Sequence, residues 1–518
     1  MNTKALRQKV LDLAIHGKLV PQNPNDESAT VLLEKIRAEK AEKIKKGELK
    51  ADKKDSFIFT KECEFDEDKL GKCSSGTRHK RHYEQFADGT VKDIEDEIPF
   101  DVPEGWAWCR LKQLSLDMAD GPFGSNLKAE HYTKNKEARI IQLSNIGEYG
   151  WREENTKFTT LEHAKNNISR SIVEPGNLVI AKMMPAGKAI ICPNNEKMYV
   201  LSSDAVKLVP TSLINSNYLL NSINSPFFRA SVTDNVQGTT RLRTSISKLR
   251  ECFFPLPPFA EQERIVSSIE RIFAQINNLE ESKSNLESVI KQTKSKILDL
   301  AIHGKLVPQD PNDEPAEELL KRIATSDNRP YEKVEEEPFE IPDSWKWVKL
   351  NDLAEIARGG SPRPIQDYIT KDKDGINWIK IGDTIAESKY ITSAKEKIKP
   401  EGKKHSRFVH AGDFLLTNSM SFGRPYILKI DGCIHDGWLV FANIKEYLLQ
   451  DYLYYALSSA YIYENFSNVA AGSTVKNLKS DTVKQVDFPL PPLSEQKRIV
   501  EAIENMYEVL DQIQNNLV

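Results

Sequence analysis

The stretch Leu11-Asp-Leu-Ala-Ile-His-Gly-Lys-Leu-Val-Pro-Gln22 recurs letter for letter at Leu298–Gln309. A second phrase, Phe254-Pro-Leu-Pro-Pro-Phe-Ala-Glu-Gln-Glu-Arg-Ile-Val266, returns in closely similar form at Phe488–Val500. In the middle of the chain the Pro-rich phrase comes first, whereas at the two ends the order is reversed. Joining the C-terminus to the N-terminus would complete a second copy of the central unit. The sequence therefore predicts a circularly permuted repeat with pseudo-twofold symmetry and neighbouring termini.

A third correspondence locates an insertion in the first half. Pro99–Trp108 matches Pro338–Trp347, and the offset between the copies falls from 287 residues at Leu11 to 239 at Trp106, a difference of 48. The extra residues fall in a Lys/Glu-rich stretch with few apolar residues. We expect 37–97 to form an extended charged linker, with a lysine-rich DNA-binding arm as the alternative.

A long central helix is predicted from about Glu261 to His303. Its apolar residues keep alternating spacings of three and four, interrupted at Lys283 and Thr293, which is typical of a coiled coil. The C-terminal segment continues the same seam, and we expect the two segments to pair antiparallel. At about 1.5 Å per residue, some 40 residues would make a strut of about 60 Å. The predicted seam comprises Ile265, Ile269, Ile272, Ile276, Leu279, Leu286, Ile290, Ile297, Leu300, Ile499, Ile503, Met506, Leu510 and Ile513.

The ends of these helices carry cap signals. His16-Gly17 and His303-Gly304 combine a potential cation with a glycine that can adopt a left-handed conformation, and we assign both histidines to helix capping and not to catalysis. Ser494 is the expected N-cap of the C-terminal helix.

After each Trp-x-Trp, two halves of similar length contain short β-type runs followed by a helix, expected at about 216–224 and 445–458. We therefore predict an α+β protein in which two similar α/β domains are separated by an antiparallel two-helix coiled coil. The expected segments are 1–36, N-terminal helix; 37–97, linker; 98–253, first domain; 254–325, central helix; 326–337, linker; 338–487, second domain; and 488–518, C-terminal helix.

Composition excludes some classes of protein. No apolar run is long enough for a membrane span and the N-terminus lacks a signal peptide's apolar stretch, so we expect a cytoplasmic protein. Six cysteines in 518 residues indicate no disulfide framework. Cys63, Cys73, His79 and His82 have no usual zinc spacing, which favours a loop over a metal site.

No catalytic signature is present. There is no phosphate-binding Gly-x4-Gly-Lys-Ser/Thr, no Gly-x-Gly-x-x-Gly turn, and no Asn-Pro-Pro-aromatic motif. We expect no metal and no cofactor in this chain.

Clusters of cations and hydroxyls occur instead in both domains, around 240–250 and 393–407. Such groups suit phosphate oxygens and, for arginine, guanine in a major groove; a solvated surface loop is the alternative. The candidate DNA-contacting residues are Lys128, Thr239, Thr240, Arg241, Arg243, Lys248, Arg363, Lys380, Lys399, Lys403, Lys404, Arg407, Ser473 and Thr474.

These phrases resemble the specificity subunits of type I restriction–modification systems. The resemblance is carried by the two repeated phrases, by Pro103-Glu-Gly-Trp106, by Gly121-Pro-Phe-Gly-Ser125, and by Gly359-Gly-Ser-Pro362 followed by Asn377–Asp383. It implies that each domain reads half of a bipartite, asymmetric target in double-stranded DNA while the helices set the spacer.

The resemblance also implies the partners. Two modification (methyltransferase) subunits would dock on the helices, and restriction (translocase/nuclease) subunits would join them, bringing S-adenosylmethionine, ATP and Mg to the complex. The chain itself would be non-enzymatic, with no membrane partner. The alternatives are an enzyme, such as a fused methyltransferase or nuclease, and a coiled-coil scaffold that does not touch DNA.

Overall fold

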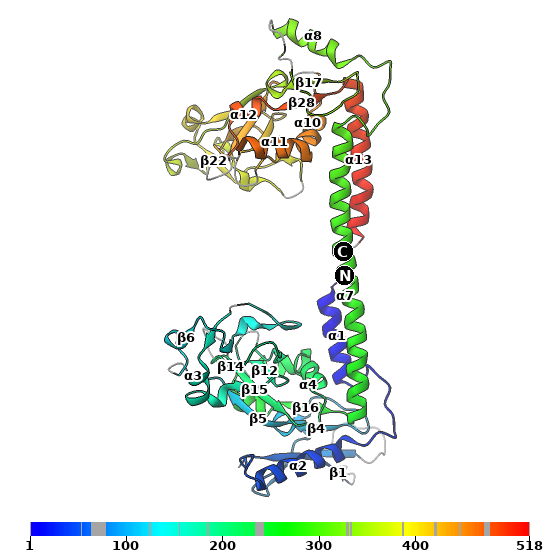
Figure 1. Cartoon of the computed structure of the whole chain (residues 1–518), viewed down its shortest axis with the longest axis vertical. Coiled ribbons are helices and arrows are strands. Elements are labelled where there is room, and N and C mark those ends of the chain that lie inside the picture. The colour runs from blue at the N-terminus through cyan, green and yellow to red at the C-terminus, as the bar shows by residue number, and fades with distance from the viewer. Residues whose placement is uncertain are drawn as a thin grey trace. The chain divides into compact units, whose positions relative to one another are not determined.

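The chain folds into two compact units, Met1–Glu280 and Glu281–Val518, whose boundary lies inside one long helix (Figure 1). The computed structural model describes all residues except 1, 53, 64–78, 124–125, 155, 184–185, 234–242, 328–330, 332–333, 386–387, 419–421, 445–446, 471–476 and 517–518. Within the described ranges, no helix combines the length and apolarity that a bilayer crossing requires.

The first unit is built on two larger sheets. One is antiparallel, with order β13 (Ala189–Ile191), β12 (Leu178–Ala181), β15 (Ala205–Pro210), β5 (Ser115–Asp120). The other is mixed, with order β11 (Ile172–Val173), β14 (Tyr199–Leu201), β7 (Ala138–Ile141), β10 (Phe158–Thr159), β6 (Tyr132–Thr133), and its β14–β7 pair is parallel. Helices α4 (Ser216–Ile223), α5 (Pro226–Thr233) and α6 (Ile246–Arg250) follow them in the chain.

The second unit repeats this plan. Its first sheet has the order β18 (Glu355–Arg358), β27 (Trp438–Ala442), β24 (Phe414–Thr417), β25 (Pro425–Leu428), β21 (Tyr390–Ile391). Its second sheet has the order β19 (Ile369–Thr370), β22 (Glu396–Ile398), β20 (Ile376–Ile379), β26 (Gly432–Ile434), β23 (Arg407–Val409), with β20 and β26 parallel. Helices α10 (Gln450–Leu457), α11 (Ala460–Ala470) and α12 (Ser480–Lys484) follow. The predicted mixed fold class with two similar domains is confirmed.

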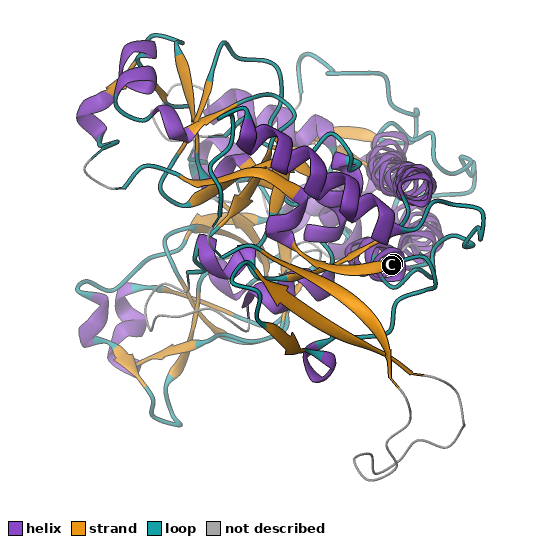
Figure 2. Cartoon of the chain, turned by 90° about the horizontal axis from the view of Figure 1, so that it is seen from below, coloured by secondary structure: helices purple, strands orange, loops and turns teal. Residues whose placement is uncertain are grey.

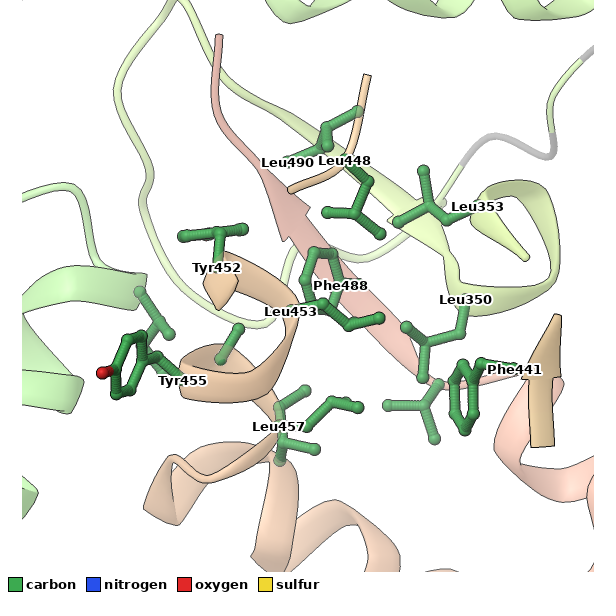
Figure 3. Close-up of a cluster of buried hydrophobic side chains, with 14 of the residues drawn as sticks. Leu350, Leu353, Phe441, Leu448, Tyr452, Leu453, Tyr455, Leu457, Phe488 and Leu490 are labelled. Atoms are coloured by element: carbon green, nitrogen blue, oxygen red, sulfur yellow. The ribbon is translucent and has the colours of Figure 1, made fainter. Parts of the chain in front are cut away.

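Apolar residues of these elements form a buried core in the second unit (Figure 3). Leu350 and Leu353 of the short helix α9 (Leu350–Leu353) pack with Phe441 of β27 and Phe488 of β28 (Asp487–Leu490). Because β28 carries the Pro-rich phrase, this phrase is a core strand that leads into the following helix.

The repeated phrases build the same buried hub in each unit. In the first unit the Trp106 indole N–H donates to Glu261 Oε2 at 3.0 Å, and the Gln22 amide donates to Glu261 Oε1 at 3.1 Å. Beside it, β4 (Ala107–Arg110) pairs with β16 (Phe253–Leu256). The equivalent bonds in the second unit, from Trp345 and Gln309 to Glu495, measure 2.9 and 2.6 Å, beside the pair of β17 (Lys346–Lys349) and β28.

Helix α7 (Phe259–Ile302) has one short partner in each unit. In the first unit α1 (Thr3–Ile15) lies beside its N-terminal part, where the Arg7 guanidinium bonds Asn277 and Glu280 at 2.7 and 2.9 Å (Figure 1). In the second unit α13 (Leu493–Asn515) lies beside its C-terminal part, where the Tyr507 hydroxyl donates to the Lys294 carbonyl at 3.0 Å.

Burial along the predicted seam is uneven. Ile265, Ile269, Ile276, Ile290, Ile297, Ile499 and Ile503 are buried, while Ile272, Leu286, Leu300 and Leu510 are half-buried. Leu279, Met506 and Ile513 are 50%, 43% and 41% exposed, so the packed seam is shorter than the spacing predicts. The exposed positions lie in the middle of α7 and in the C-terminal half of α13, so the helical spacing alone does not establish burial.

The cap predictions have different outcomes. His16 is the C-cap of α1, and its backbone N–H donates to the Asp12 carbonyl, with Gly17 at φ +64°. Gly304 has φ +66°, and the His303 N–H donates in the same way to Asp299. The capping role of both histidines is confirmed. Ser494 is not the N-cap of α13, because the helix begins at Leu493 and its N-cap is Pro492.

The expected linker at 37–97 is wrong. Helix α2 (Ala29–Lys45) precedes a three-stranded antiparallel sheet of β1 (Ser56–Cys63), β2 (His79–Phe86) and β3 (Val91–Asp93), whose first two strands are long (Figure 2). Ile58 and Ile94 pack on Trp108, so a few well-placed apolar residues suffice despite the high charge.

The inserted part of the first unit is shorter than the expected linker at 37–97, because α2 has a counterpart in the second unit. In the second unit α8 (Ala316–Asp327) is a separate helix after α7, so 254–325 is not one continuous helix. The Ala29 N–H donates to the Gly105 carbonyl and the Ala316 N–H to the Ser344 carbonyl, at 2.8 and 2.9 Å. Helix α2 is thus the counterpart of α8, and the β1–β3 sheet is the inserted part.

Candidate nucleic-acid interface

In each unit, a glycine-containing segment passes closely over a turn, and the two turns are equivalent. In the first unit the Gly121 N–H donates to the Ala205 carbonyl at 3.1 Å, and a Cβ on Gly121 would lie 1.7 Å from the Ser202 carbonyl oxygen. In the second unit the Gly359 N–H donates to the Trp438 carbonyl at 2.9 Å, and a Cβ there would lie 2.3 Å from the His435 oxygen. Only glycine permits this approach, because any side chain would displace the backbone.

The crossed turns have equivalent positions in the two folds. We call Ser202–Asp204 the β14–β15 turn and His435–Gly437 the β26–β27 turn. Each joins a strand of a parallel pair in one sheet to a strand of the other large sheet of its unit.

In the second unit, five predicted DNA-contacting residues lie around the loop 359–367. The Lys399 ammonium donates to the Asp367 carbonyl at 2.8 Å, and the Arg407 guanidinium donates to the Arg358 carbonyl at 3.0 Å. A Cβ on Gly402 would lie 3.2 Å from Tyr368, so the helical turn η8 (Pro400–His405) lies against the loop. The exposed Lys403 and Lys404 lie on that turn, and Arg363 lies on the loop itself.

A cavity of about 520 Å³ opens beside this loop. Its apolar wall includes the buried Trp378, and its polar wall includes Arg363, Gln366 and Lys380. The Lys380 ammonium bonds Glu396 Oε1 at 2.6 Å, which neutralises that carboxylate. The remaining lining residues are Ser361, Pro362, Ile365, Ile369, His435 and Asp436.

The carboxylate of Asp436 is held in its ionised form. The Ser361 hydroxyl donates to Asp436 Oδ1 at 3.0 Å, and His435 Nε2 lies 3.0 Å from the same oxygen. Burial opposes ionisation, but the hydrogen bond from Ser361, the neighbouring His435 ring and the positive charge of Arg358 outweigh it and lower the pKa of Asp436. The cavity therefore holds a fixed negative charge next to exposed cations.

The first unit brings fewer of the predicted residues together. The Arg243 guanidinium donates to the Ser203 carbonyl at 2.7 Å and lies 3.4 Å from Asp204, so it sits on the β14–β15 turn. Lys128 is exposed at the start of the helical turn η3 (Ala129–His131). Lys248 instead lines a cavity of about 310 Å³ with Arg110 and Phe253.

Some predicted positions lie outside the described residues, and some relevant groups were missed. Thr239, Thr240, Arg241, Ser473 and Thr474 fall in ranges that the structure does not describe. Asp436 and His435 were missed because sequence reasoning searched for cations. The Gly359-Gly360 pair beside a proline was the signal that marks this loop.

The zinc question also has a partial answer. Cys73 lies outside the described residues. Among those that are described, no three His, Cys, Asp or Glu side chains are arranged to hold a metal ion. His82 Nδ1 lies 2.9 Å from Glu95 Oε2, so this ring has a carboxylate partner in the inserted sheet.

The two units share one frame, and each carries a glycine-crossed turn with an exposed arginine beside it. A family model described as type I restriction modification DNA specificity domain matches residues 126–288 and 342–517. Since the matches cover more than half of the chain, the protein belongs to this family.

Relatives of known name agree with this membership. The EcoEI specificity subunit of Escherichia coli is 25% identical over an alignment that covers 99% of this chain and 90% of the relative. The EcoAI specificity subunit of E. coli is 27% identical, covering 69% and 63%. A solved chain from a type I restriction–modification system matches with a TM-score of 0.56 at 18% identity, covering 81% of this chain and 94% of that one, which shows the shared fold.

Proposed function

We propose that this chain gives a type I restriction–modification complex its DNA sequence specificity. Each unit contacts one half of a bipartite, asymmetric target in double-stranded DNA, and α7 with its partners sets the spacer between the halves. The observation that carries the proposal is the duplication of one frame with different residues on its equivalent turns. A shared frame keeps the docking geometry, while different side chains read different bases.

The proposed division of labour leaves chemistry to partner subunits. Two modification subunits dock on the helices and transfer a methyl group from S-adenosylmethionine, and restriction subunits use ATP and Mg. The seam residues Leu279, Met506 and Ile513 are exposed in this chain, so their apolar side chains are available to a docked subunit.

The test uses the chain purified with its modification subunit and a library of random duplexes. Methylated duplexes are recovered and sequenced, and we expect a split motif with a spacer of fixed length. Sequence-blind methylation, or a single continuous motif, would contradict the proposal. The chain alone, incubated with S-adenosylmethionine and DNA, serves as the control and is expected to transfer no methyl group.

A further inference from the structure

The arginine on the loop 359–367 is oriented by a carboxylate. Arg363 Nη2 lies 3.5 Å from Asp436 Oδ2, while 83% of the arginine side chain is exposed. A guanidinium has five N–H donors in a planar fork, and the contact with Asp436 leaves most of this fork facing solvent. The Arg363 side chain is therefore oriented by Asp436, and its remaining N–H donors are available to a ligand.

The carboxylate is itself fixed by the β26–β27 turn. The Gly437 N–H donates to His435 Nδ1 at 2.9 Å, so Nδ1 is an acceptor and carries no proton. The proton of the neutral ring is therefore on Nε2, which lies 3.0 Å from Asp436 Oδ1. With the Ser361 hydroxyl on the same oxygen, Oδ2 is left to face Arg363.

We propose that Arg363 reads a guanine in the half-site that the second unit contacts, with Asp436 as its positioning residue. Arginine pairs with guanine O6 and N7 through two parallel N–H donors, and a guanidinium that is already oriented loses less freedom on binding. Lysine has no planar fork and can make only the charge contact. This inference rests on the proposed function.

The first unit supports the assignment independently. Arg243 lies 3.4 Å from Asp204 on the β14–β15 turn, although it comes from a segment near α6 and not from the Gly121 loop. Two different segments thus bring an arginine to a carboxylate on the equivalent turn of each fold, although Asp204 lies one residue further along its turn than Asp436. Simple duplication does not explain this, because Arg243 and Arg363 are not at corresponding positions of the repeat.

The nearby lysines have a different chemistry. Lys403 lies with its ammonium 3.9 Å from the centre of the Phe408 ring, and Lys404 is exposed on the same turn. Neither has a carboxylate that orients it among the described ion pairs. Point charges without a planar fork suit phosphates, which carry no sequence information.

The test compares Arg363→Lys, Arg363→Ala and Asp436→Asn with the matched control Lys404→Ala, each in complex with the modification subunit. Methylation of a duplex library is measured at several salt concentrations. We expect Arg363→Lys and Arg363→Ala to lose about 5- to 150-fold of the discrimination at one G·C position of one half-site. Asp436→Asn should relax the same position by a smaller factor, and Lys404→Ala should weaken all sequences equally and lower the salt dependence.

The outcomes separate the inference from the proposed function. If Arg363→Lys keeps the wild-type motif, or Arg363→Ala weakens all duplexes uniformly as Lys404→Ala does, then Arg363 contacts phosphate and the inference is overturned. If the wild-type complex selects no split motif, the proposed function fails instead. Unchanged selection of the other half-site shows that each variant is folded. If Arg363→Ala also loses selection of the other half-site, that variant is misfolded, and the result for Arg363→Lys then tests the inference.

Discussion

At the residue scale, the most constrained groups are the hub carboxylates Glu261 and Glu495. Each is 1% exposed and accepts hydrogen bonds from an indole and an amide, both of them neutral donors. Burial raises the pKa of both carboxyls, and the two hydrogen bonds only partly oppose it. The folded state therefore binds these protons more tightly than the unfolded chain does.

We expect Glu261→Gln to destabilise the first unit by about 1–3 kcal/mol, because one amide oxygen cannot replace two acceptors and a buried donor is left unpaired. The pKa of Glu261 is higher in the folded state than in the unfolded chain. The wild-type protein therefore loses stability as the pH rises from the ordinary carboxyl pKa through the folded pKa, where Glu261 ionises. The gap between wild type and variant should therefore be largest at acidic pH and shrink towards neutrality in thermal unfolding.

The control is Glu48→Gln, which changes an exposed carboxylate 3.8 Å from the Lys43 ammonium. Its effect should stay within about 0.5 kcal/mol. A gap for Glu261→Gln that widens with rising pH would show that the folded state does not raise the pKa of this carboxyl.

Arg243 provides a prediction about recognition. Arg243→Ala removes an exposed guanidinium from the β14–β15 turn, so selection at one half-site should weaken while the other is unchanged. Motif analysis of methylated duplexes measures this directly. Loss of both half-sites together would indicate misfolding instead.

At the element scale, the helix pairs differ in burial along their length. Ile499 and Ile503 of α13 are fully buried, whereas Ile513, two turns beyond Met506 on the same seam, is 41% exposed. The N-terminal turns of α13 belong to the core of the second unit, and Tyr507 and Leu510 are partly buried against it, whereas Met506 and Ile513 are exposed. Under the proposed function, stability and docking would therefore depend on different side chains of one helix.

We expect Ile499→Ala to cost about 2–5 kcal/mol in urea unfolding, because it leaves a cavity in a packed core. Ile513→Ala has the same chemistry at an exposed position and should change the stability of the isolated chain by about 0.5 kcal/mol or less. If Ile513 contacts a modification subunit, its variant should instead weaken assembly, as measured by sedimentation of the complex. Equal loss of stability in both variants would show that the seam is packed to its end.

At the scale of the whole molecule, α7 belongs to both units and is continuous from Phe259 to Ile302. The proposed function makes its length a determinant of the spacer. Seven extra helical residues add about 10 Å and nearly two full turns, so the helical faces stay almost in register.

We therefore expect a heptad inserted near Lys283 to lengthen the spacer, with about 3 base pairs as the natural increment at 3.4 Å per step. Both half-site sequences should be unchanged in methylation mapping. Altered half-site sequences with an unchanged spacer would refute the assignment of α7 to spacing.

The sequence by itself determined the repeat, the two similar domains and the helix seam. Repeated phrases such as Leu11–Gln22 and helical periods are local patterns, and identical local patterns fold in the same way. The capping of α1 by His16 and Gly17 followed for the same reason.

Only the tertiary structure decided that the charged insertion is a sheet, that Leu279 and Ile513 are exposed, and that Asp436 faces Arg363. Each of these depends on side chains that are far apart in the sequence. In the charged insertion, the composition does not reveal the few apolar contacts that Ile58 and Ile94 make with Trp108. Arg363 and Asp436 are separated by 73 residues in the sequence. No local pattern carries that information, because the fold alone brings these atoms together.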